Sequence, residues 1–386
     1  MQVLMAVHSN YDNDARVKRE AEALFSLGFN VTVAAAWPYD QPSPPEPYEL
    51  EGVQVVPITL QRGSGIGRFA EMMSKMYRVV KSRQFDLLHL HDADTLLPGL
   101  LAASRATPVI YDSHEWYPGN AALVGKNMRR RIWQSVERFG LSRIHTLITV
   151  NQSIQKLYRE FYHYNGEARV LRNFASINPS DQPNDTQQSG WQALLNKLKE
   201  QATYLAIYSG HLTPGRGLIH YLEAIKYTPG WGLIIAGGGS CSSWLQQKIE
   251  SMDLNNRVKF AGMLSHGELY PLIQTCDAGL CYIEPVSESY YYALPNKISE
   301  YVQLGVPVIG SNLPEIAGLI RKYNIGYIAK SPTRIAECLN SISRKEHNFT
   351  DSLKSARQML SWDKEKQELE RLYQSLASTI KTTGLR

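Results

Sequence analysis

Residues 287–311 read SESYYYALPNKISEYVQLGVPVIGS, and this stretch predicts a loop, a short helix and a buried strand in succession. Pro295 and Asn296 suit the first turn and the cap of the helix, and Gly305 suits its left-handed end. Glu300 then lies one turn inside the helix, whose unpaired N–H groups and dipole favour an anion. The stretch therefore predicts a seat for a diphosphate with Glu300 near sugar hydroxyls or, alternatively, an ordinary surface helix with a solvated glutamate.

Strands and helices alternate on both sides of this stretch. The predicted strands are 3–7, 31–35, 53–58, 85–90, 109–111, 147–150, 170–173, 202–208, 233–236, 258–260 and 278–282. The predicted helices are 14–27, 65–84, a helix from 151 to 158, 218–227 and a long charged helix over 351–376. Such alternation is typical of parallel, doubly wound α/β sheets. The polar, turn-rich segment 176–189 marks a linker, so we expect two domains.

The totals are those of an ordinary globular enzyme. The 386 residues are 43% hydrophobic and 20% charged, and the four cysteines show neither CxxC nor zinc spacing. The short apolar start is unlike a signal peptide and no run approaches membrane-spanning length, so we expect a cytoplasmic location. The net charge of +5 is too small to indicate nucleic acid as a partner, but it is compatible with an anionic substrate.

Two basic and apolar segments leave a membrane contact open. Helix 65–84 carries apolar residues along one side and basic residues along the other, and residues 126–133 read KNMRRRIW. Each segment is either an ordinary packed helix with a solvated basic side or a surface that rests on anionic lipid headgroups. A peripheral position at the inner face of the membrane is therefore the alternative to a purely cytoplasmic one.

Polar side chains follow two predicted strands of the first half. Residues 89–94 read HLHDAD after one strand, and residues 112–115 read DSHE after the next. The HxHxD spacing resembles a metal motif, but no further ligands follow at the expected distances. Because open α/β sheets bind ligands beyond the carboxyl ends of their strands, a crevice explains the polarity better. We expect His114 to contact the reacting group; its alternative is a histidine satisfied within its loop.

Each glycine cluster of the second half follows a strand. SGHLTPGRG occupies residues 209–217, GGG residues 237–239 and GML residues 262–264. His211 and Arg216 lie on the first of these loops, where a phosphate would meet a helix start and a guanidinium together.

Eight segments, taken together, resemble the retaining family-four glycosyltransferases, and the resemblance covers nearly the whole chain. They are NDARVKREAEAL, HLHDADTLLPG, VIYDSHEWYP, LITVNQSI, YSGHLTPGRGL, AGGG, VKFAGML and LPNKISEYVQLGVPVIGS, in that order. The resemblance implies the α/β fold called GT-B, two Rossmann-like doubly wound domains facing across a cleft. It further implies an acceptor-binding domain over 1–175, a linker over 176–195, a nucleotide-sugar-binding domain over 196–360, and a terminal helix over 361–386 that crosses back to the first domain.

The resemblance also implies an activity. A hexose or N-acetylhexosamine-type sugar would pass from a UDP-sugar, or alternatively a GDP-sugar, to a saccharide or lipid-linked acceptor in cell-surface polysaccharide synthesis. Configuration would be retained, and neither a metal nor another cofactor would be needed. Two alternatives are a non-hydrolysing nucleotide-sugar epimerase, which needs acid and base carboxylates around the sugar, and a non-catalytic partner subunit.

The same resemblance assigns roles to individual residues. Glu300 matches the second glutamate of a paired motif that hydrogen-bonds ribose, and Tyr292 stands where the first glutamate is expected. The catalytic set is His114, Arg216 and His211. The donor-binding set is Glu300, Gly210, Gly262, Met263, Leu264, Tyr292, Leu294, Asn296 and Lys297. The acceptor-side set is His91, Asp92 and Glu115.

Overall fold

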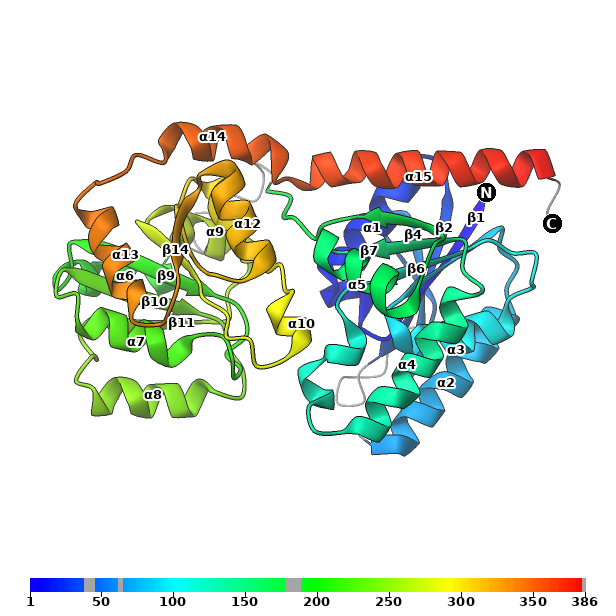
Figure 1. Cartoon of the computed structure of the whole chain (residues 1–386), viewed down its shortest axis with the longest axis horizontal. Helices are drawn as coiled ribbons and strands as arrows, with labels where there is room; N and C mark the ends of the chain where they lie inside the picture. Colours follow the sequence, from blue (N-terminus) through cyan, green and yellow to red (C-terminus); the bar gives the residue numbers. More distant parts are fainter. Residues whose placement is uncertain (38–45, 62–64, 178–188, 384–386) are drawn as a thin grey trace. The chain divides into compact units, whose positions relative to one another are not determined.

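The chain folds into two compact units (Figure 1). The computed structural model describes residues 1–37, 46–61, 65–177 and 189–383. Unit 1 comprises Met1–Arg172 together with Glu365–Arg386, and unit 2 comprises Asn173–Lys364. Most of the predicted linker, 178–188, lies outside the described residues. Its predicted end at residue 195 is wrong, because helix α6 (Ser189–Lys199) buries Trp191 and Leu195 in the core of unit 2.

Unit 1 is built on an eight-stranded sheet in the order β3-β4-β2-β1-β5-β6-β7-β8, parallel except for β3. Its strands are β1 (Gln2–Val7), β2 (Asn30–Trp37), β3 (Tyr48–Leu50), β4 (Val53–Thr59), β5 (Leu87–His91), β6 (Val109–Ser113), β7 (Thr146–Thr149) and β8 (Glu167–Val170). The predicted strand 170–173 is therefore shifted. Val170 is the last residue paired with β7, and the N–H of Arg172 donates to the Glu365 carboxylate (2.8 Å) instead of to a strand.

The helices of unit 1 follow the predicted alternation. They are α1 (Ala15–Ser26), α2 (Gly65–Lys81), α3 (Ala93–Ala102), α4 (Asn127–Leu141), α5 (Gln152–Tyr162) and α15 (Trp362–Thr383). Asp14 caps α1 by accepting hydrogen bonds from the N–H groups of Arg16 and Val17. Tyr373 of α15 packs edge-on against Phe29, which ties the end of the chain to unit 1.

The single helix predicted over 351–376 is instead two helices, α14 (Thr350–Met359) and α15. Leu360 and Trp362 at the break are buried, and the carbonyl of Leu360 accepts a hydrogen bond from the Gln303 side chain (2.9 Å). The N–H of Trp362 donates to the carbonyl of Ala175 (3.1 Å). These tertiary bonds replace the helical hydrogen bonds that a continuous helix would make at this point.

Unit 2 is built on a parallel six-stranded sheet in the order β11-β10-β9-β12-β13-β14. Its strands are β9 (Tyr204–Ser209), β10 (Trp231–Ala236), β11 (Val258–Gly262), β12 (Ala278–Cys281), β13 (Val308–Ser311) and β14 (Gly326–Ala329). Further helices are α7 (Leu218–Lys226), α8 (Ser242–Ser251), α9 (His266–Gln274), α12 (Pro314–Tyr323) and α13 (Arg334–Ser343). Leu205 and Ile207 belong to one core, and the alternate residues Ala206 and Tyr208 belong to a second. Both faces of the sheet are therefore covered, as in a doubly wound fold.

The stretch 287–311 contains one more helix than predicted, α10 (Glu288–Tyr291), before α11 (Lys297–Leu304) and β13. Gly305 ends α11 with a φ of 80°, as predicted. The expected cap is wrong, because Asn296 has helical backbone angles and its side chain makes no capping hydrogen bond. The start of α11 is therefore not closed by the side chain of its cap residue.

Replacing Gly237 with alanine is expected to destabilise unit 2 by about 2–4 kcal/mol. Gly237 has a φ of +144°, and an added Cβ would lie 1.9 Å from the carbonyl oxygen of Gly210. The free energy of unfolding in urea measures the loss. Gly318→Ala is the matched control, since its Cβ would meet nothing within 4 Å and a helical alanine should stabilise by about 0.5–1 kcal/mol. Equal stability of both variants would contradict the close approach of Gly237 to the backbone of Gly210.

Candidate functional site

The predicted site residues lie at the carboxyl ends of the parallel strands, near the switch point of each sheet. In unit 1 the strand order reverses between β1 and β5, and in unit 2 it reverses between β9 and β12. Open α/β sheets bind ligands at such points. The sequence predicted candidates in loops after the parallel strands, and the structure brings several of them together in each unit.

The glycine-rich loops of unit 2 are joined by backbone hydrogen bonds. The N–H of Gly210 donates to the carbonyl of Ala236 (2.8 Å), and the N–H of Gly237 donates to the carbonyl of Gly262 (2.7 Å). Three loops that are far apart in the sequence thus lie side by side.

A small cavity of about 120 Å³ opens between these loops. Its lining includes four residues of the predicted donor and catalytic sets, Gly210, His211, Met263 and Leu264, together with Ala236, Gly237 and Leu269. Met263 is 74% exposed, which is unusual for a methionine and is typical of a side chain that a bound ligand covers. The cavity is smaller than the roughly 300–1,000 Å³ of typical ligand pockets, so it has room for only part of a nucleotide.

Two cations of unit 2 lie against aromatic rings. Lys297 Nζ is 3.6 Å from the centre of the Tyr208 ring, and it also lies beside the backbone of Gly210. The Arg216 guanidinium lies 4.7 Å from the centre of the Tyr290 ring, and its Nε is buried without a hydrogen-bond partner. Burial, together with the positive charge of Arg216, lowers the pKa of Lys297 to about 8.

These two cations carry the chemistry of unit 2. In the described part of the chain neither Lys297 nor Arg216 makes an ion pair with a carboxylate. Like charges held together in a partly buried place repel, and a ligand with negative charge relieves that repulsion. The arrangement therefore suits an anion with at least two charged oxygens.

The other predicted donor residues border this set. Glu300 is in the first turn of α11, and Tyr292 follows α10 with its ring edge-on to Tyr291. Leu294 packs against the core of unit 2, so its side chain has a structural role. His211 is exposed, and its backbone carbonyl accepts a hydrogen bond from the Tyr208 hydroxyl (2.7 Å).

The candidate residues of unit 1 meet at His114. Its Nδ1 is 3.3 Å from Asp92, and its Nε2 is 3.3 Å from Asp112 and 3.1 Å from His91. Burial disfavours the charged imidazolium, but the two carboxylates outweigh it and raise the pKa of His114 to about 9. His114 is thus a cation held between two carboxylates, with 19% of its side chain exposed.

The sequence did not predict a role for Arg16, which holds Asp112 in place beside His114. Arg16 donates two hydrogen bonds of 2.8 Å to Asp112, another to the carbonyl of Leu171 (2.9 Å), and lies 3.0 Å from Glu20. Burial alone would raise the pKa of Asp112, but the charges of Arg16 and His114 hold it well below its usual value. The available signal was that Arg16 and Glu20 share the apolar face of their helix, where charges are expected only in pairs.

Glu20, His89, His91 and Asp112 are buried with ligand atoms within 4.8 Å of one another, a spacing that would also suit a metal ion. The Arg16 guanidinium already binds both carboxylates of this group. The positive charge that the cluster requires is therefore supplied by the protein, and we interpret the cluster as an ion network that fixes the strand ends beneath His114.

Asp92 and Glu115 complete the acceptor-side set. Asp92 has a φ of +63°, a strained conformation for a residue other than glycine, and it accepts a hydrogen bond from the N–H of His114 (3.0 Å). The Glu115 carboxylate accepts a hydrogen bond from the amide of Asn120. Strain of this kind persists where the surrounding structure fixes it, and such positions cluster at functional sites.

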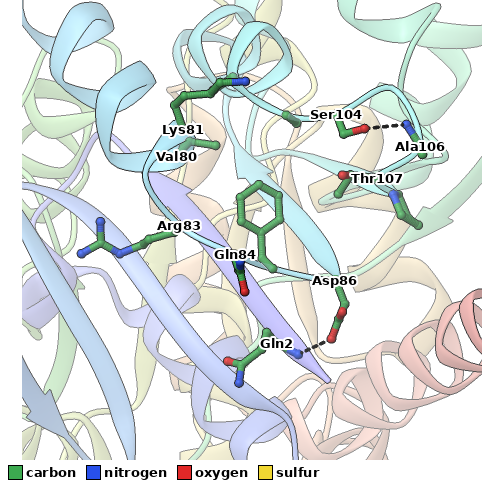
Figure 2. Close-up of a pocket in the computed structure, with 13 residues that line it drawn as sticks. Gln2, Val80, Lys81, Arg83, Gln84, Asp86, Ser104, Ala106 and Thr107 are labelled. Carbon is green, nitrogen blue, oxygen red and sulfur yellow. Dashed lines mark hydrogen bonds between the residues drawn. The ribbon is translucent and has the colours of Figure 1, made fainter. Parts of the chain in front are cut away.

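A larger cavity, of about 540 Å³, lies at the opposite ends of the strands of unit 1 (Figure 2). Asp86 accepts a hydrogen bond from the N–H of Gln2 (2.8 Å), and Ser104 accepts one from the N–H of Ala106 (3.3 Å). None of the predicted site residues lines it. The volume of a cavity alone therefore does not identify the candidate site in this protein.

Two units with mainly parallel sheets and polar clusters at the carboxyl ends of their strands are the arrangement of doubly wound α/β proteins. Residues 14–173 match the family model described as a glycosyl transferase 4-like domain, and residues 194–359 match that of glycosyl transferases group 1. The chain therefore belongs to the group 1 glycosyltransferases and has the GT-B fold. Membership of this family is a reason to prefer a glycosyltransferase to the epimerase and to the subunit without an activity.

Known proteins are similar to this chain at low identity. The glycogen synthase of Mycobacterium tuberculosis is 24% identical over 276 residues, which are 69% of this chain and 62% of that protein. The sucrose-phosphate synthase of Thermosynechococcus elongatus has a TM-score of 0.80 and 16% identity, over 98% of this chain and all of that one. The HepE protein of Anabaena, solved with UDP and glucose, has a TM-score of 0.71 and 17% identity, over 97% and 100% of the two chains.

Within the part of the chain that the structure describes, no helix is both long enough and apolar enough to cross a membrane.

Proposed function

We propose that this chain is a retaining glycosyltransferase that moves a hexose or N-acetylhexosamine-type sugar from a UDP-sugar to a saccharide or lipid-linked acceptor in cell-surface polysaccharide synthesis. A GDP-sugar is the second candidate donor. The observation that carries the proposal is the pair of cations Arg216 and Lys297 beside the glycine-rich loops of unit 2, which make no ion pair with a carboxylate among the described residues. A pyrophosphate supplies the charge that this pair lacks.

The small cavity beside the cations supports a uracil base. It is lined by His211, Met263 and Leu264 and has a volume of about 120 Å³, which suits a base with one ring better than one with two. We assign Glu300, in the first turn of α11, to hydrogen bonds with the ribose hydroxyls. The HepE structure, with UDP and glucose bound to a protein of the same fold, is consistent with this choice.

The reaction breaks the bond between the anomeric carbon and the β-phosphate oxygen and forms a bond from that carbon to an acceptor oxygen. Negative charge grows on the departing diphosphate, and Arg216 and Lys297 stabilise it. In our proposal the diphosphate takes the proton of the acceptor hydroxyl on the same face of the sugar, so configuration is retained. No carboxylate nucleophile is required, and the two cations do the work that a divalent metal would do in other transferases.

We assign the sugar contact to His114 and the acceptor contacts to His91, Asp92 and Glu115 of unit 1. The carboxylates on both sides of His114 keep its imidazolium charged, so it donates rather than accepts hydrogen bonds. A donor in a fixed orientation suits a sugar hydroxyl or an oxygen near the reacting carbon.

Incubation of the protein with labelled UDP- and GDP-sugars tests the proposal. Slow release of sugar and nucleoside diphosphate, with the released sugar first formed in the donor's own anomeric configuration, is the expected result. A changed sugar still attached to UDP would identify an epimerase, and binding without any turnover would identify a non-catalytic subunit. Either of these two results would overturn the proposal.

The affinity for UDP is expected to fall as the pH rises from 7 to 9. The pKa of Lys297 is about 8, so its ammonium is lost over this range, and binding weakens by up to about tenfold per pH unit above 8. Calorimetric titration with UDP at several pH values measures the effect. Lys297→Arg keeps the charge and should flatten the pH dependence, whereas Lys297→Met should bind weakly at every pH. A wild-type affinity that is constant to pH 9 would remove Lys297 from the phosphate site.

A further inference from the structure

A surface at the start of α4 exposes large apolar side chains in a row. Val124, Met128 and Ile132 are 60%, 78% and 57% exposed, and they recur every four residues. Met128 and Ile132 lie within α4, where residues four apart share a face. The opposite side of α4 buries Glu137, Gly140 and Leu141. The row, which we call the α4 ridge, is therefore the side of the helix that unit 1 leaves uncovered.

Basic residues flank the α4 ridge on both sides. With 3.6 residues per turn, Arg129 and Arg131 project about 80° to either side of the line from Met128 to Ile132. Both arginines are exposed. From Tyr117 to Val136 the sequence contains one lysine and three arginines and no acidic residue. The ridge is thus apolar at its centre and cationic at both margins, and this segment of the sequence carries no negative charge.

The first turn of α2 extends this surface. Phe69 of α2 packs edge-on against Trp133 of α4, with ring centres 5.3 Å apart, and Ile66, one turn before Phe69, is 80% exposed. The rest of α2 is packed, since Met72 and Met76 are buried. From the sequence, helix 65–84 was either an ordinary packed helix or a helix that contacts lipid headgroups. Beyond its first turn, α2 is an ordinary packed helix.

We propose that the α4 ridge, with Ile66 beside it, docks on the surface of an anionic phospholipid bilayer. An apolar row with arginines on both sides is the pattern of an interfacial helix, whose side chains enter the headgroup region while its cations meet lipid phosphates. A protein partner with an acidic surface would satisfy the arginines, but it would leave the central row of apolar side chains without a hydrophobic complement.

The ridge is connected to the candidate residues of unit 1. Trp133 of α4 contacts Tyr117, with ring centres 4.6 Å apart, and Tyr117 is three residues beyond His114. Docking would therefore bring a bilayer surface near the loop to which we assign acceptor contacts. The docking itself does not rest on the proposed transferase activity, because none of the ridge residues belongs to the donor, acceptor or catalytic sets.

Co-sedimentation of the full chain with vesicles tests the docking. We expect association with vesicles of phosphatidylcholine mixed with phosphatidylglycerol and little with phosphatidylcholine alone. Arg129→Gln with Arg131→Gln should weaken association about thirtyfold. Met128→Ser with Ile132→Ser should weaken it about tenfold or more. Added salt should weaken the wild type and the serine variant more than the glutamine variant.

Two control pairs match these changes elsewhere. Lys354→Gln with Lys364→Gln removes two exposed charges from unit 2, and Tyr227→Ser with Met359→Ser removes two exposed apolar side chains. Both controls should bind vesicles like the wild type, and all four variants should keep the wild-type melting temperature and UDP affinity. No association with anionic vesicles, or equal loss in ridge and control variants, would overturn the proposal. So would sensitivity to the arginines alone, which would indicate electrostatic adsorption to anionic headgroups without entry of the apolar row.

Discussion

Arg216→Ala is expected to lower kcat by about 10²–10³ while the chain stays folded. The Arg216 guanidinium is held over the Tyr290 ring with a buried, unpaired Nε, so it is positioned before any ligand arrives. Preorganised donors of this kind stabilise charge that grows in the transition state, here on the departing diphosphate. Steady-state kinetics of donor hydrolysis and of transfer measure the loss.

Two companion variants separate the charge of Arg216 from its position. Arg216→Lys keeps the charge but not the planar fork, and it should recover only part of the rate. Tyr290→Leu keeps the arginine but removes the ring beneath it, and it should raise KM and lower kcat by less than the alanine variant. Arg334→Ala, at an exposed position on α13, is the control for a general loss of positive charge. A kcat of Arg216→Ala within a few fold of the wild type would remove Arg216 from the reaction.

His114→Ala is expected to abolish turnover while the affinity for UDP stays within a few fold of the wild type. The cations that we assign to the diphosphate, Arg216 and Lys297, belong to unit 2 and are untouched by the change. His114 instead supplies a charged donor, which we assign to the sugar. Single-turnover rates with the donor and calorimetric affinities for UDP are the two measurements, and unchanged turnover would remove His114 from the site.

The pH dependence of stability provides a control for this variant. The pKa of His114 is raised to about 9 in the folded chain from an ordinary value of 6.5. Its ion pair with Asp112, a carboxyl whose pKa is held well below its usual value, therefore stabilises the fold fully below pH 6.5, and that contribution is lost as the pH rises through about 9. The wild type should exceed His114→Ala in the free energy of unfolding at pH 6, and the difference should shrink toward pH 9. A difference that does not change with pH would show that folding leaves the pKa of His114 unchanged.

The pattern of residues determined much of the fold. Buried apolar runs followed by glycine or polar clusters predicted the parallel strands, because a strand that is covered on both faces must be apolar along its whole length. Gly305 ended α11 as predicted, since only a left-handed residue satisfies the last carbonyls there. The sequence went wrong where local signals competed with distant partners, as at Asn296, whose residue type suits a cap but whose backbone is helical.

The ends of elements were the least predictable for the same reason. The break between α14 and α15 has no glycine or proline, and it exists because Gln303 and Ala175 bind the backbone at Leu360 and Trp362. The strand 170–173 was displaced to Glu167–Val170 because Arg172 pairs with Glu365, almost two hundred residues later. No window of neighbouring residues contains such information.

By itself the sequence determined which residue types stand at the ends of the strands, namely cations and glycines in unit 2 and histidines and carboxylates in unit 1. Only the tertiary structure decided how these groups act on one another. Arg16, 96 residues before Asp112, fixes the negative charge on Asp112 that faces His114, and the rings of Tyr208 and Tyr290 lie against Lys297 and Arg216. Charge and pKa depend on distance and solvent access, and these arise only when remote segments pack together.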